Sequence, residues 1–144
     1  MNHFLIITNE FKDKGLVFTE KIRRYIEARG GSCQCYSSTG DDARHAAPDS
    51  ADIAEGTECV LVLGGDGTLI RAAAKLVDEK LPLIGVNLGT LGYLCELEAA
   101  NVFDAIDELM DGHYMLEERM MLSAYGIKNG IQTEAKTALN DVVI

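Results

Sequence analysis

Two kinds of hydrophobic pattern alternate along most of this chain. Short, mainly apolar runs predict strands, and unbroken runs are typical of parallel strands buried on both faces. They lie at residues 4–8, 32–36, 59–63 and 83–86. Apolar residues spaced three and four apart, or runs of helix-forming residues, predict helices at 18–29, 68–77 and 102–110. This alternation predicts an α/β fold, a Rossmann-like parallel sheet with flanking helices.

The pattern changes near Tyr114. Two strand-like segments, 120–128 and 131–139, flank Asn129-Gly130, which is a strong hairpin signal. Residues 142–144 begin another apolar run, from which we expect a truncated, β-rich C-terminal domain. The predicted domains are therefore an α/β nucleotide-binding domain at 1–116 and the start of a second domain at 117–144. The polar stretch 37–56 is predicted to be a loop with room for one helical turn.

Composition narrows the possible partners. The chain of 144 residues has a formal net charge of −10, which disfavours nucleic acids and anionic membranes as partners. Nucleotides remain possible, because backbone N–H groups and Mg²⁺ hold phosphates without surplus Lys or Arg. The spacing of the four cysteines is not that of a zinc site. We expect the cysteines to be small, buried hydrophobic residues with free thiols, as in a protein of the reducing cytoplasm.

Residues 64–68, Gly-Gly-Asp-Gly-Thr, carry the most informative chemistry, because they join a predicted strand to a predicted helix. The three glycines allow a tight turn and close approach of a ligand to the backbone. The helix N-terminus directs free N–H groups towards the turn, so the segment is predicted to bind phosphate. Asp66 is placed to orient a hydroxyl, to accept its proton or to hold Mg²⁺ through water. The structural alternative is a tight turn in which Asp66 caps the helix.

Two common nucleotide motifs are absent from this turn. A dinucleotide fingerprint would need glycine where Ile70 stands, and a Walker A loop would need lysine immediately before Thr68. The turn is therefore typical neither of a simple Rossmann oxidoreductase nor of a P-loop NTPase.

The same segment resembles the signature of the NAD kinases and their relatives, the diacylglycerol, sphingosine and phosphofructokinases. Three further stretches, in the family's order, resemble the NAD kinases in particular: 85–94 (Gly-Val-Asn-Leu-Gly-Thr-Leu-Gly-Tyr-Leu), 118–122 (Glu-Arg-Met-Met-Leu) and 138–143 (Ala-Leu-Asn-Asp-Val-Val). Together these resemblances cover essentially the whole chain.

The resemblance implies an enzyme that phosphorylates NAD to NADP in a cleft between two domains. It implies ATP or polyphosphate as the donor, a divalent metal such as Mg²⁺ with no ligand assigned here, and a homodimer or homotetramer. Asp66 would be the catalytic residue, acting on the 2′-hydroxyl of the adenine-side ribose. The residues implied to bind NAD or ATP are Gly64, Gly65, Gly67, Thr68, Asn87, Tyr93, Leu94, Asn140 and Asp141. Asp141 departs from the family's commoner glutamate.

Several interpretations stay open. Arg71 is a candidate phosphate contact, although a solvated helix face is the simpler explanation for it. A diacylglycerol- or sphingosine-type lipid kinase is one alternative, which would need a different continuation after Thr68. The other is a non-catalytic nucleotide-binding fragment or assembly module, because unpaired strand edges in residues 117–144 invite association.

Overall fold

Five parallel strands form the central sheet, in the order β2-β1-β3-β4-β5. The computed structural model describes residues 1–38, 46–89 and 92–139. The strands of the sheet are β1 (His3–Asn9), β2 (Ser32–Ser38), β3 (Cys59–Gly64), β4 (Leu83–Asn87) and β5 (Leu97–Glu98). The three central strands, β1, β3 and β4, are largely buried, in agreement with their unbroken apolar runs.

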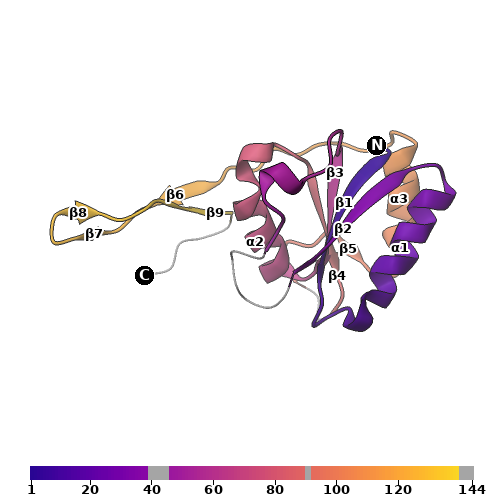
Figure 1. Cartoon of the computed structure of the whole chain (residues 1–144), viewed down its shortest axis with the longest axis horizontal. Helices are drawn as coiled ribbons and strands as arrows, with labels where there is room; N and C mark the ends of the chain where they lie inside the picture. The colour runs from indigo at the N-terminus through magenta and orange to yellow at the C-terminus, as the bar shows by residue number, and fades with distance from the viewer. Residues whose placement is uncertain (39–45, 90–91, 140–144) are drawn as a thin grey trace.

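Three helices cover the two faces of this sheet (Figure 1). Helices α1 (Val17–Ala28) and α3 (Val102–Met110) pack on one face, and α2 (Asp66–Lys75) packs on the other. Alternate side chains of β1 point to opposite faces, so Phe4 and Ile6 join the core beneath α1 and α3, whereas Leu5 and Ile7 join the core beneath α2. The predicted α/β sheet with flanking helices is confirmed.

The winding of the chain reverses between β1 and β3. From β1 the chain passes through α1 to β2 on one side, and from β3 it passes through α2 to β4 on the other. In open parallel sheets such a reversal leaves a crevice at the carboxyl ends of the two strands, and ligands bind there. The loops after β1 and β3 are therefore the segments that the topology places at a binding site.

A long antiparallel hairpin follows the sheet and extends away from it (Figure 1). Strand β6 (Leu122–Ala124) pairs with β9 (Lys136–Ala138), and β7 (Ile127–Lys128) pairs with β8 (Ile131–Gln132). Asn129 and Gly130 connect β7 to β8 with φ values of 54° and 76°, as a type I′ turn requires. The predicted hairpin is confirmed, but each arm is interrupted around Gly126, where Thr133 bonds the backbone with both its N–H and its hydroxyl.

Other differences from the sequence predictions are small and local. Helix α2 begins at Asp66, two residues before the predicted start, because the Gly65 carbonyl accepts N–H bonds from Thr68 and Leu69. The predicted loop 37–56 contains one 3-10 turn, Ser50–Asp52, within its described part. Cys35 is exposed rather than buried, because β2 is an edge strand. Two further 3-10 turns lie at Lys14–Leu16 and Val77–Glu79.

Across the described ranges, we find no helix with the length and apolar character needed to span a membrane.

The central strand β3 allows a direct test of the core. Leu61 is 0% exposed and packs beneath α1 and α3, so Leu61→Ala is expected to lower the free energy of unfolding by about 2–5 kcal/mol through lost burial and a residual cavity. Leu116, which is 65% exposed, is the matched control. Leu116→Ala should change the free energy of unfolding by less than about 0.5 kcal/mol. Urea unfolding followed by circular dichroism measures both; equal effects would contradict the assigned core.

Candidate functional site

Three neighbouring strands end at one edge of the sheet and bring their following loops together. Strand β1 ends at Asn9, β3 at Gly64 and β4 at Asn87, and the register pairs Gly64 with Asn87. Two of these terminal residues, Gly64 and Asn87, are among the predicted ligand-binding residues. This edge is also the crevice that the reversed winding creates.

The glycine turn is tightly packed against the helix that follows it. A Cβ at position 64 would lie only 2.4 Å from Oγ1 of Thr68, so the close contact requires glycine. The Thr68 side chain is buried, and its hydroxyl accepts a hydrogen bond of 3.3 Å from the amide of Asn9. Thr68 thus ties the turn to the end of β1, a contact that the sequence did not indicate.

Asp66 turns its carboxylate towards the segment after β4. The backbone N–H of Tyr93 donates to Oδ2 at 2.7 Å, and those of Leu94 and Cys95 donate to Oδ1 at 3.2 Å each. The Tyr93 N–H contributes most to holding the pKa of Asp66 below its usual range, and the other two bonds act in the same direction against partial burial. The N-cap of α2 is Gly65. The carboxylate of Asp66 therefore anchors residues 93–95 and stays ionised.

Gly92 makes this anchoring possible. A Cβ at position 92 would lie 2.3–2.4 Å from the carboxylate atoms of Asp66. Real Cβ atoms do not approach so closely, so any other residue here would push the segment and the carboxylate apart. Gly92, in the stretch 85–94, therefore leaves the space that the carboxylate of Asp66, in the stretch 64–68, occupies.

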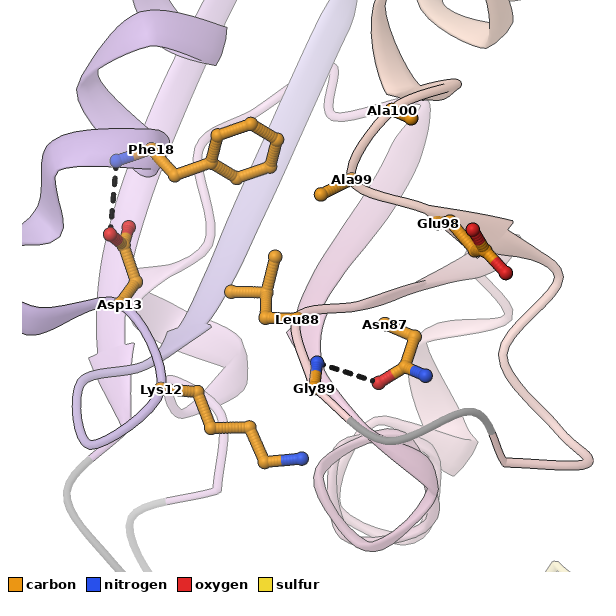
Figure 2. A pocket seen from close by; sticks show the side chains of 9 residues that line it. All are labelled: Lys12, Asp13, Phe18, Asn87, Leu88, Gly89, Glu98, Ala99 and Ala100. Atoms are coloured by element: carbon orange, nitrogen blue, oxygen red, sulfur yellow. Dashed lines mark hydrogen bonds between the residues drawn. The ribbon is translucent and has the colours of Figure 1, made fainter.

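A cavity of about 400 Å³ opens beside the glycine turn (Figure 2). Asn87 forms part of its wall; this side chain is only 5% exposed, and its Oδ1 accepts the Gly89 N–H at 3.1 Å. The described residues that line the cavity come from the loop after β1, the start of α1 and the segments around β4 and β5: Lys12, Asp13, Phe18, Asn87, Leu88, Gly89, Glu98, Ala99 and Ala100.

The sequence prediction missed the loop after β1. Lys12 extends from this loop towards Gly89 (Figure 2). Its ammonium donates a 3.3 Å hydrogen bond to the Gly64 carbonyl. Asp13 is buried at the same place and accepts bonds from Phe18 and Thr19. Burial alone would raise the pKa of Asp13, but these bonds lower it below the usual value. Only the position of this loop, directly after a predicted parallel strand, could have identified it as part of the site.

The other nominated residues are placed as follows. Tyr93 is fully exposed beside Asp66, whereas Leu94 packs against the core beneath α2. Arg71 lies over Gly67, where a Cβ would be 3.3 Å from its guanidinium. Asn140 and Asp141 lie outside the described residues, so the structure does not bear on them.

The acidic groups near the turn do not resemble a protein-built metal centre. Within the part of the chain that the structure describes, no three His, Cys, Asp or Glu side chains are grouped to hold a metal ion. Asp66 already gives three acceptor positions to backbone N–H groups. Mg²⁺ is commonly held by one or two carboxylates together with substrate phosphates, so an ion at this site would depend on the phosphates.

Comparison with known proteins supplies an independent line of evidence. The family described as the ATP-NAD kinase N-terminal domain matches residues 6–114. The NAD kinase of Agathobacter rectalis is 51% identical over 144 residues, and that of Lachnospira eligens is 38% identical over 151 residues; each match covers 100% of this chain and 50% of the relative. This chain thus spans about half the length of these curated relatives.

A solved structure shares the fold. The crystal structure of a yeast NADH kinase complexed with NADH superimposes with a TM-score of 0.72 at 14% identity, covering 97% of this chain and 47% of the yeast chain. At that identity the likeness shows the common architecture, a parallel sheet followed by antiparallel strands.

The hydrogen bonds between Asp66 and residues 93–95 predict a specific pH response. In the folded protein the Asp66 carboxylate should titrate below its ordinary value of about 3.9. Its bonds to residues 93–95 should therefore persist as the pH falls past that value and break only as the pH falls through the lowered pKa. Gly92→Ala should raise the midpoint towards the ordinary value by separating the partners.

NMR titration of the Asp66 carboxyl carbon and of the amides of residues 93–95 measures this midpoint. Gly89→Ala is the control, because a Cβ there meets its nearest neighbour at 3.5 Å, an ordinary contact. A wild-type midpoint at or above the ordinary value, or equal shifts in the two variants, would argue against the contact.

Proposed function

Because this chain belongs to the ATP-NAD kinase family, we propose that it carries the catalytic aspartate of an enzyme that converts NAD to NADP. The phosphoryl donor is ATP or polyphosphate, and the acceptor is the 2′-hydroxyl of the adenine-side ribose. The observation that carries the proposal is the Asp66 carboxylate, ionised and held on both oxygens beside a glycine turn at the winding reversal of the sheet. Residues 1–116 form the nucleotide-binding domain in this proposal, and 117–144 begin the second domain.

The hydrogen bonds of Asp66 suit it to orient a hydroxyl. A carboxylate offers about four acceptor positions, and three are used by the N–H groups of Tyr93, Leu94 and Cys95. The Cys95 thiol, a weak donor, also bonds this carboxylate, and the ribose hydroxyl takes the place of that weak bond. The three bonds also fix the direction of that position, because they prevent the side chain from rotating.

The reaction proceeds by transfer of a phosphoryl group between two oxygens. The 2′-oxygen forms a bond to the terminal phosphorus of the donor, and the bond from that phosphorus to its bridging oxygen breaks. The bonding electron pair stays on the bridging oxygen of the departing ADP or shortened polyphosphate, and the hydroxyl proton passes to Asp66. Since its pKa is below the usual range, Asp66 is a weak base that accepts the proton late, as the new bond forms.

Other residues have supporting roles in this proposal. Gly64, Gly65 and Gly67 let the phosphates approach the backbone, with Thr68 behind them and Arg71 over Gly67. Asn87, Tyr93 and Leu94 lie on the neighbouring segment, and the resemblance adds Asn140 and Asp141 as NAD contacts. Mg²⁺, carried by the donor phosphates, would neutralise part of their charge.

The alternatives have less support. None of the three relatives described above is a lipid kinase. An assembly module would not require the Asp66 carboxylate to be held by three backbone N–H groups, although the exposed hairpin is compatible with association.

The catalytic test uses a chimera in which this chain is followed by the second half of the Agathobacter rectalis NAD kinase. It should form NADP from NAD with ATP and Mg²⁺, and Asp66→Asn should lower the rate by at least about 10²-fold, the scale of general-base effects. Asp78→Asn removes the same charge at an exposed position in the Val77–Glu79 turn and should leave the rate unchanged.

A coupled enzymatic assay specific for NADP measures the rate. A folded chimera that forms no NADP would overturn the proposed function. Near wild-type turnover by Asp66→Asn would overturn the role of Asp66 alone.

A further inference from the structure

We propose that Lys12 binds the terminal phosphates of the phosphoryl donor over Gly65 and neutralises their charge. This inference rests on the proposed function and adds a residue outside the motifs that suggested it. Lys12 lies in the loop after β1, whereas the glycine turn follows β3. The two loops meet because β1 and β3 are neighbours at the winding reversal of the sheet.

The ammonium group of Lys12 lies directly over the glycine turn. Its Nζ is 3.3 Å from the Gly64 carbonyl oxygen and would be 2.6 Å from a Cβ at position 65. It would also be 3.5 Å from a Cβ at Gly89, on the segment after β4. Lys12 therefore reaches the space between two glycine-containing loops, where no side chain blocks approach to the backbone.

The loop that carries Lys12 is firmly attached to the fold. The backbone N–H groups of Lys12 and Asp13 both donate to the Asn9 carbonyl at 3.0 Å. The buried Asp13 carboxylate accepts the N–H of Phe18 at 2.9 Å and both the N–H and the hydroxyl of Thr19, at 2.8 and 2.7 Å. Thr19 in turn bonds the buried hydroxyl of Thr8 on β1 at 2.6 Å. These bonds position the base of the Lys12 side chain before any ligand arrives.

The negative charge around the site means that a nearby cation strengthens phosphate binding. The whole chain carries a formal charge of −10, and the cavity beside the turn includes the carboxylates of Asp13 and Glu98. Among the described residues that line this cavity, Lys12 is the only one with a positive charge. An ammonium has three N–H donors, and towards the described residues it uses one, for the Gly64 carbonyl. The other two are suited to phosphate oxygens, and charge-assisted bonds of this kind are the stronger ones.

The test separates phosphate binding from catalysis by using inorganic tripolyphosphate and the chain of 144 residues itself. Calorimetry should show that Lys12→Gln weakens tripolyphosphate binding about 10- to 100-fold, the range for losing one charged hydrogen bond. Lys12→Arg keeps the charge and should recover most of the affinity. Lys14→Gln is the matched control, because Lys14 is an exposed lysine of the same loop that lies outside this cavity, and its affinity should equal that of the wild type.

Amide NMR spectra show whether each variant is folded, and tripolyphosphate should shift the signals of Gly65 and Gly89 in the wild type. Absence of binding to the wild-type chain, wild-type affinity in a folded Lys12→Gln, or an equal loss in Lys14→Gln would each overturn the proposal. In the chimera, Lys12→Gln should raise the KM for ATP with little change in the KM for NAD. If the chimera forms no NADP while the binding result holds, the proposed reaction fails and the phosphate site stands.

Discussion

The site depends on one topological constraint, the reversal of winding between β1 and β3. Because the connections from these strands run to opposite sides of the sheet and over opposite faces, a crevice is left where both strands end. The glycine turn, the Lys12 loop and the segment after β4 all converge there. Each of these segments then depends on its neighbours: Thr68 bonds Asn9, Lys12 bonds Gly64, and Asp66 bonds residues 93–95.

Much of the sheet and its helices could be predicted from sequence, because burial on two faces leaves unbroken apolar runs and burial on one face leaves helical periodicity. Residues 59–63 and 102–110 are the clearest examples, since β3 and α3 were found at or within one residue of those limits. The start of α2 was harder, because Asp66 and Gly67 are poor helix formers and only the carbonyl of Gly65 shows that the helix has begun. Strand β5, with two residues, has too short a pattern to be recognised.

Only part of the site could be predicted from the sequence, because some of its residues have a local signature and others are brought in from distant positions. Local chemistry identified Gly64, Asp66 and Asn87, because glycines and polar residues directly after strands stand out in a sequence. The partners of Asp66 could not be found in this way, since backbone N–H groups carry no residue signature and lie 27 to 29 positions away. Lys12 was missed because a lysine in a polar loop is ordinary until the neighbouring strand is known. Family resemblance identified the motifs but did not show that Gly92 makes room for the carboxylate of Asp66.

The hairpin β6–β9 gives the molecule two regions of very different local stability. Ile127 pairs with Gln132 and Ile131 pairs with Lys128, so the two isoleucines lie on opposite faces of the hairpin. They are 71% and 73% exposed, so the hairpin buries little apolar surface. A two-stranded ribbon of this kind is marginal in water, whereas β1 and β3 are bonded on both edges and covered on both faces. Local opening of the ribbon therefore costs far less free energy than opening of the sheet. The amide hydrogens of the hairpin would exchange with solvent through frequent local opening, whereas those of β3 would exchange only through rare, near-global unfolding.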